Sequence, residues 1–217
     1  MYDFHCHSLL SDGELLPAEL ARRYEVAGYK AIAITDHVDI SNIDFVIDAI
    51  LKFCKGWPKN AKLKILPGIE LTHLNLEDFA PLASLARKRG IKIIVAHGQT
   101  IVEPVRKGTN KAALEADIDI LAHPGFISDS ELKLAAKKGV SLELTSRKGH
   151  SLTNGYVAKK ALQFGAELSL NNDAHIPYDI IAPEQLRDVA YGAGLSQKDV
   201  EKIYENYQKI LDKYKVI

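Results

Sequence analysis

The sequence predicts an α/β fold, a distorted seven-stranded (β/α) barrel with parallel strands. Seven short apolar segments alternate strictly with amphipathic helical segments, and parallel neighbours need such a crossover between them. An open, doubly wound sheet would show a topological reversal partway along the chain. The sequence shows no clear reversal of this kind, which favours a closed or nearly closed barrel. Polar residues of metal-binding type follow the ends of nearly all the strands, which is where such barrels place their functional residues. We therefore expect one domain over residues 1–217.

The first expected strand has two unlike faces. Tyr2, Phe4 and Cys6 alternate with Asp3, His5 and His7, so the two histidines should point to the same side, close enough to chelate one cation. Cys6 then belongs to the core. Asp12 follows in a Ser-Asp-Gly turn and is a further candidate ligand.

The remaining elements follow in order. The first helix begins near Pro17, a residue that the first helical turn tolerates, and ends at Gly28. Asn110, Ser128 and Ser196 are expected to cap later helices. Further strands are expected over residues 30–35, 63–69, 91–96, 118–122, 140–145 and 166–171. Further helices are expected over residues 45–54, 77–88, 110–114, 128–139, 157–165, 183–192 and 196–213, so residues 183–213 form C-terminal helices.

Composition excludes some functions. Lys plus Arg and Asp plus Glu both number 28, which argues against a nucleic-acid surface built on bulk charge. No apolar run is long enough to span a membrane, and the N-terminus does not resemble a signal peptide. Two cysteines make no disulfide framework, so a cytoplasmic location is expected.

Imidazole and carboxylate side chains follow six of the seven strands. They are His5 and His7, His37, Glu70, His97, His123, and Asp173 with His175. Such ligands suit zinc, manganese or iron, and no thiolate cluster indicates a structural zinc site. This set exceeds what one cation needs, so two or three divalent ions that share a carboxylate are expected.

These motifs together resemble those of the PHP (polymerase and histidinol phosphatase) family. The motifs, in chain order, are His5-x-His7, Ser11-Asp12-Gly13, Ile34-Thr35-Asp36-His37, Gly68-Ile69-Glu70, His97-Gly98, Ala122-His123-Pro124 and Asn172-Asp173-Ala174-His175. The resemblance implies a TIM-barrel-like fold with a trinuclear metal centre at the carboxyl-terminal face. It assigns the first metal to His5, His7, Glu70 and Asp173, the second to Glu70, His97 and His123, and the third to Asp12, His37 and His175.

The resemblance also implies a reaction. A hydroxide that bridges the first two metals would attack phosphorus, with Glu70 as the bridging carboxylate. The sequence leaves the proton donor to the leaving group open between His37, Asp12 acting through a metal-bound water, and bulk water. In some members of the family a histidine replaces Asp12, which leaves the preferred metal of the third site open.

Substrate contacts are predicted from the loops. Arg147 follows the sixth strand, where a guanidinium can bind phosphate oxygens in a bidentate manner. His150 and His73 are further candidates, and Lys107 is a weaker one. Asp36 adjoins His37 but should face the opposite way, which favours a structural role.

We predict metal-dependent hydrolysis of a small phosphomonoester, with histidinol phosphate as the first candidate by resemblance. A nucleotide or cyclic-phosphate phosphoesterase is the alternative enzyme, and a non-catalytic metal-binding PHP module is the alternative from another class. Other metal-dependent barrels with His-x-His hydrolyse amides or lactones, but those usually bridge their metals with a lysine. No membrane or nucleic-acid partner is expected, and the sequence does not set the oligomeric state.

Overall fold

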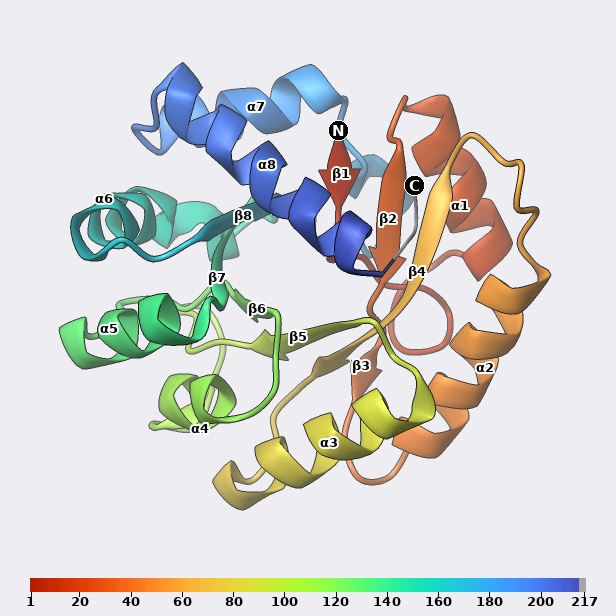
Figure 1. Cartoon of the computed structure of the whole chain (residues 1–217), viewed down its shortest axis with the longest axis horizontal. Coiled ribbons are helices and arrows are strands. Elements are labelled where there is room, and N and C mark those ends of the chain that lie inside the picture. The colour runs from red at the N-terminus through yellow and green to blue at the C-terminus, as the bar shows by residue number, and fades with distance from the viewer. Residues whose placement is uncertain (215–217) are drawn as a thin grey trace.

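The computed structural model describes residues 1–214 and has the expected alternation of strands and helices (Figure 1). The strands are β1 (Tyr2–Asp3), β2 (Ala31–Ile34), β3 (His37–Val38), β4 (Lys64–Leu71), β5 (Ile93–His97), β6 (Ile120–Ala122), β7 (Ser141–Thr145) and β8 (Leu168–Asn171). The helices are α1 (Pro17–Val26), α2 (Ile43–Gly56), α3 (Phe79–Arg89), α4 (Thr109–Glu115), α5 (Asp129–Lys138), α6 (Asn154–Phe164), α7 (Pro183–Gly192) and α8 (Gln197–Lys213). Short 3-10 turns lie at Leu76–Asp78, His150–Thr153 and Pro177–Asp179.

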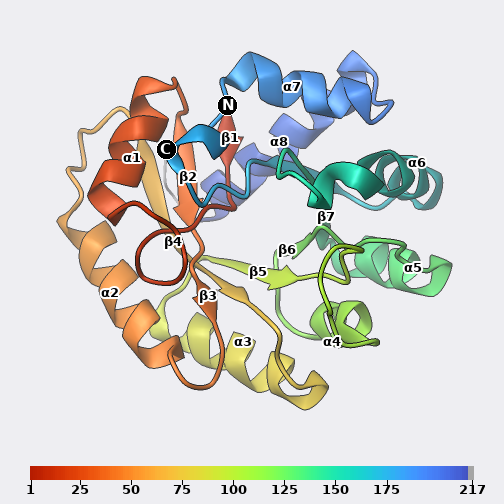
Figure 2. The same cartoon turned by 180° about the vertical axis from the view of Figure 1, so that it is seen from behind.

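The sheet is a nearly closed barrel of parallel strands. Its path runs β1-β2-β4-β5-β6-β7-β8, and β3 pairs with β4 beside this path. A parallel bridge between Cys6 and Ala174, with a hydrogen bond of 2.8 Å from His7 N to Ala174 O, joins the chain after β1 to the chain after β8. Figure 2 shows the helices surrounding the strands from the opposite side. The TIM-barrel-like fold predicted from the sequence is confirmed.

The second expected strand is interrupted in the structure. Ala31 to Ile34 pairs with β4, the chain then leaves the ladder at Thr35 and Asp36, and His37 and Val38 pair with the end of β4. The buried carboxylate of Asp36 accepts hydrogen bonds from Ser8 N and Ser8 Oγ, both at 2.7 Å. Asp36 therefore has the structural role that the sequence indicated, since it holds the loop after β1.

Local signals for the helix ends were correct with one exception. Pro17 is the first residue of α1, and Ser128 and Ser196 cap α5 and α8 with capping boxes. The prediction for Asn110 was wrong, because the cap of α4 is Gly108, with φ of 96°. The Asn110 side chain instead accepts a hydrogen bond from Gln99 N and donates one to a carbonyl of the neighbouring loop.

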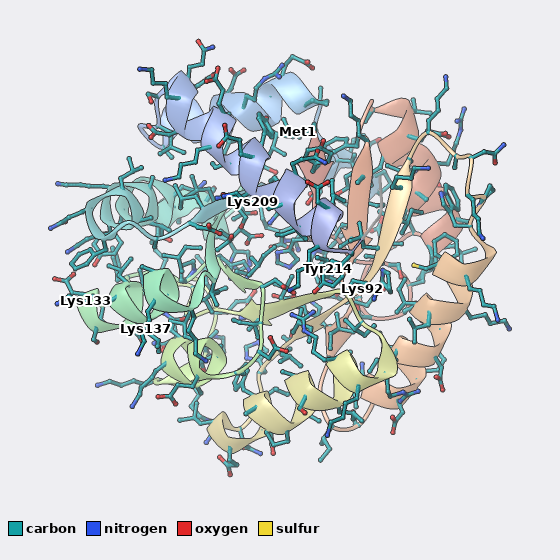
Figure 3. All side chains as sticks on the ribbon, in the orientation of Figure 1. Met1, Lys92, Lys133, Lys137, Lys209 and Tyr214 are labelled. Carbon is teal, nitrogen blue, oxygen red and sulfur yellow. The ribbon has the colours of Figure 1, made fainter. Side chains whose placement is uncertain are left out.

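The C-terminal helices pack on the barrel of this chain. In Figure 1, α8 lies across the front of the barrel. Tyr207 of α8 packs edge-on against Phe4, with ring centroids 4.8 Å apart, and its hydroxyl donates to Leu170 O of β8. Tyr214 lies beside Lys92, the residue before β5, as Figure 3 shows. Helix α8 therefore covers the amino-terminal ends of strands and leaves the opposite face open. Within residues 1–214, no helix is both long and apolar enough to cross a membrane.

Candidate metal centre and cleft

The carboxyl-terminal face of the barrel carries a cleft of about 610 Å³. Six of the chain's eight histidines line it, and the other two, His5 and His7, lie buried beneath it. The lining is Ser11, Asp12, His37, Asn42, Thr72, His73, His97, Glu103, Pro104, His123, Arg147, His150, Asp173 and His175. The strands bring these side chains together because the ends of parallel neighbours meet at one edge; for example, the β3–β4 register places His37 beside Glu70.

The floor of the cleft is a buried group of imidazoles and carboxylates. His5 and His7 point to the same side, as predicted, with ring centroids 5.0 Å apart. His5 Nε2 lies 3.3 Å from Glu70 Oε2, and His7 Nε2 lies 3.4 Å from Asp173 Oδ1. His123 Nε2 lies 3.7 Å from Asp173 Oδ2. Ligand atoms at these separations can surround a cation.

Several of these buried atoms lack a hydrogen-bond partner within the described part of the chain. They are His5 Nε2, both ring nitrogens of His7, Glu70 Oε1 and His123 Nδ1, whereas Glu70 Oε2 lies 2.7 Å from His37 Nδ1. An unsatisfied buried polar atom costs about 1–3 kcal/mol, so a cluster of five favours a compensating ligand. A divalent metal ion is the ligand that imidazole nitrogens and carboxylate oxygens share. The residues present therefore fit the expected metal centre.

At His7 and Glu70, the surroundings shift the pKa toward the form that binds metal. Burial lowers the pKa of His7 well below its ordinary value, and the neighbouring His37 and His175 lower it further. Burial would raise the pKa of Glu70, but nearby histidines, His5 foremost, outweigh it and hold that pKa well below its ordinary value. A neutral imidazole and an ionised carboxylate are the states that ligate metal ions.

A second group lies closer to the opening of the cleft. Asp12 Oδ1 lies 3.5 Å from His37 Nε2 and 3.4 Å from His175 Nε2. His7 completes this group, whose four ligand atoms lie within 4.8 Å of one another. Asp12, His37 and His175 are the residues that the resemblance assigned to the third metal.

His97 lies beside His123, with which the resemblance grouped it, and the two ring centroids are 4.5 Å apart. His97 Nε2 also lies 2.9 Å from Glu103 Oε2. The ligand atoms of His97, His73 and Glu103 lie within 4.8 Å of one another. The ligand atoms of His123, His5 and Asp173 meet the same limit.

The predicted substrate contacts also line the cleft, with one exception. Arg147 Nε lies 4.0 Å from Asp173 Oδ2, and an Arg147 Nη1 hydrogen bond of 2.8 Å to Asp179 fixes the guanidinium. His150 and His73 both lie within reach of Glu103. Lys107 is exposed and is not part of the lining.

Sequence reasoning missed two carboxylates. Glu143 of β7 is fully buried, lies 2.7 Å from His5 Nδ1 and accepts a hydrogen bond from His123 N. A charged residue in the middle of a buried strand was the available signal, since glutamate is rarely buried without a partner. Glu103 lies in the irregular loop between β5 and α4, where no local pattern marks it.

Backbone strain also coincides with the site. Within the part of the chain that the structure describes, the non-glycine residues with positive φ are His73 (52°), His123 (27°) and Asp173 (53°). Each lies at the cleft, where such conformations hold a side chain in place at a cost of roughly 1–3 kcal/mol.

Comparison with known proteins gives matches along the whole chain. The family model described as "PHP domain" matches residues 3–217. An uncharacterized protein of Methanocaldococcus jannaschii is 43% identical over 215 residues, 97% of each chain. A probable phosphatase of Thermoanaerobacter sp. is 28% identical over 166 residues, 66% of this chain and 67% of that one. Ribonuclease P protein component 3 of Methanosarcina barkeri is 30% identical over 152 residues, 67% of this chain and 56% of that one.

Solved structures support the fold. The histidinol phosphate phosphatase of Lactococcus lactis, solved with zinc, L-histidinol and phosphate, has a TM-score of 0.58 at 17% identity and covers 90% of this chain and 94% of that one. A putative histidinol phosphatase of Listeria monocytogenes has a TM-score of 0.64 at 12% identity, with 85% and 99% covered. With the motifs and the whole-chain family match, these comparisons establish that this chain belongs to the PHP domain family.

Proposed function

We propose that this protein is a metal-dependent phosphatase that hydrolyses a small phosphomonoester, with histidinol phosphate as the first substrate to test. The observation that carries the proposal is the set of buried, unsatisfied ligand atoms of His5, His7, Glu70 and His123 beneath an open cleft. Membership of the family, a relative named as a probable phosphatase and a structural neighbour solved with zinc and phosphate support it.

Two or three divalent ions, of zinc, manganese or iron, would be held by the buried group around Glu70 and by the group of Asp12, His37 and His175. When bound, such ions stabilise the charge of a transferring phosphoryl group and make water a nucleophile near neutral pH. Glu70, centrally placed between His5 and His37, is the residue most suited to connect the two groups.

The side chains of the rim would handle the substrate. Arg147, fixed by Asp179, presents a guanidinium to the cleft and would bind phosphate oxygens. His37 and Asp12 lie at the opening of the cleft. The proton for the leaving alkoxide could come from His37, from Asp12 acting through a metal-bound water, or from bulk water. Among residues 1–214, the cleft is lined by no aromatic side chain other than histidine, which favours a small, polar leaving group.

The test is phosphate release from a panel by protein loaded with zinc, manganese or iron. The panel holds histidinol phosphate, nucleoside monophosphates, cyclic phosphodiesters and a short RNA. Turnover of one phosphomonoester is the expected result. Glu70→Gln should abolish both turnover and the buried metal, whereas the same change at the exposed Glu77 should alter neither.

Bound metal without turnover of any compound would contradict the enzymatic proposal and favour a binding role. The relative named as a ribonuclease P component makes RNA the first ligand to test in that case, although the balanced charge of the chain argues against it. A cytoplasmic location and the absence of a nucleic-acid partner stay predictions.

A further inference from the structure

A buried hydrogen-bond path connects helix α8 to the candidate metal centre. The Tyr207 hydroxyl of α8 donates to Asn171 Oδ1 at 2.7 Å, sharing its proton with the carbonyl oxygen of Leu170. Asn171 Nδ2 donates to Glu143 Oε1 at 2.7 Å, and the same oxygen lies 2.7 Å from His5 Nδ1. None of the four side chains on the path is more than 2% exposed. The path therefore reaches a predicted metal ligand without meeting bulk water.

The direction of each hydrogen bond on this path is fixed by the chemistry of its groups. The backbone N–H of Phe4 can only donate, and it donates to Asn171 Oδ1 at 2.9 Å. The Glu143 carboxylate only accepts, so it requires the amide nitrogen of Asn171. A carboxamide supplies one acceptor and one donor, and its orientation is thereby determined. Burial raises the pKa of Tyr207 well above its ordinary value, so the hydroxyl keeps the proton that it donates.

The far end of the path determines which ring nitrogen of His5 can bind metal. Because Glu143 Oε1 accepts, His5 Nδ1 carries the proton and Nε2 keeps its lone pair. His5 Nε2 has no hydrogen-bond partner within residues 1–214, and it lies 3.3 Å from Glu70 Oε2. A carboxylate on the far nitrogen of a metal-binding imidazole orients the ring and raises its basicity. A displacement of Glu143 therefore changes the ligand atom of His5.

The path also crosses the seam of the barrel. The strands β1 and β8 are the two ends of the strand order, and β1 is only two residues long. Asn171 of β8 accepts its hydrogen bond from Phe4, the residue directly before His5. The Tyr207 ring packs edge-on against the Phe4 ring, and Figure 1 shows α8 crossing beside β1 and β8. Helix α8 thus supports both the backbone that carries His5 and the carboxylate that orients it.

From these contacts we propose that Tyr207 and Asn171 are positioning residues of the buried metal centre, through which α8 sets the metal affinity of His5. Tyr207 acts on Asn171, and Asn171 acts on the Glu143 carboxylate. The inference rests on the metal centre of the proposed function and on no particular substrate. Helix α8 then does more than cover the amino-terminal ends of the strands, because its docking is coupled to metal binding on the opposite side of the barrel.

The experiment compares zinc affinity in wild type, Tyr207→Phe and Tyr156→Phe by competition with a chromophoric chelator. His5→Ala identifies the zinc equivalent that His5 binds. Tyr207→Phe removes a single hydroxyl and should weaken that equivalent about threefold or more, because residues of one hydrogen-bond network are energetically coupled. Tyr156→Phe is the matched control. It loses a hydroxyl that donates to Ile127 O at 3.0 Å, away from the path, and should keep the affinity of wild type.

Two further variants test the middle of the path. Asn171→Asp sets a second carboxylate against Glu143 and should weaken the His5 equivalent by about tenfold or more. Tyr207→Phe combined with Glu143→Gln should bind this equivalent no more weakly than Glu143→Gln alone, because the path is already broken at Glu143. Urea unfolding of each metal-free variant gives the stability, so that affinities are compared under conditions in which every variant is folded.

The proposal is overturned if Tyr207→Phe weakens the His5 equivalent by less than threefold, if Tyr156→Phe weakens it equally, or if Asn171→Asp keeps the affinity of wild type. It is also overturned if the losses of Tyr207→Phe and Glu143→Gln multiply in the double variant, since Tyr207 would then act independently of Glu143. No substrate enters these measurements. Protein that shows the expected affinities but hydrolyses no phosphomonoester would therefore contradict the proposed function alone.

Discussion

Glu143 should control metal affinity through His5 without touching the metal. Its Oε1 lies 2.7 Å from both His5 Nδ1 and Asn171 Nδ2, and its Oε2 accepts from His123 N at 3.2 Å. Three donors thus converge on a carboxylate that only accepts. Burial lowers the pKa of His5, but nearby carboxylates, Glu143 foremost, outweigh this and raise the pKa well above its ordinary value. The side chain therefore fixes both the orientation and the basicity of His5.

The change Glu143→Gln keeps the shape and removes the charge. The glutamine oxygen can serve two of the three donors, and its amide then faces the third, a buried N–H left without an acceptor. That costs about 1–3 kcal/mol in the free energy of unfolding of the metal-free protein. Loss of such a support weakens metal binding about 10–100-fold, or about 1.4–2.8 kcal/mol.

Competition with a chromophoric chelator measures the affinity, and urea unfolding of metal-free protein measures the stability. Glu205→Gln, the same chemical change at an exposed position of α8, is the matched control and should alter neither. An affinity within twofold of wild type, together with unchanged stability, would refute the role given to Glu143.

Three further predictions test the rim and the barrel. Arg147→Lys should raise KM for the phosphomonoester and leave bound metal unchanged, because lysine lacks the bidentate fork; an unaltered KM in steady-state kinetics would exclude phosphate binding by this residue. Gly98→Ala should destabilise the fold by about 1–3 kcal/mol in denaturant unfolding, because the added Cβ would meet the backbone of Ala122 and Pro124. Gly56→Ala has open space around it and should be neutral. Equal unfolding midpoints for the two variants would contradict the close backbone approach at Gly98. Tyr207→Phe should lower the free energy of unfolding by about 1–3 kcal/mol in thermal unfolding, because it removes the buried hydroxyl that binds β8. Tyr191→Phe, at a residue 43% exposed, should change the stability little. Equal losses of stability in the two variants would show that the Tyr207 hydroxyl does not anchor α8.

Most of the fold could be predicted because its signals are local. Ser128 caps α5 and Pro17 begins α1 through hydrogen bonds and torsion angles within one helical turn. Asn110 shows the limit of such signals. Its side chain could serve equally well as a cap, but the tertiary structure placed the backbone of another loop within its reach, and it bonds there instead.

The candidate site divides in the same way. The sequence by itself determined which strands carry imidazoles and carboxylates at their ends, because the strand period and the common edge of a parallel sheet follow from backbone geometry. Only the tertiary structure decided which ligand atoms meet. Glu143 reaches His5 from a strand 138 residues away along the chain, and a loop without regular structure carries Glu103 to His97. Those distances depend on how the barrel closes and how its loops pack. Both result from many weak contacts between segments that are distant in the sequence, and such contacts leave no local pattern in it.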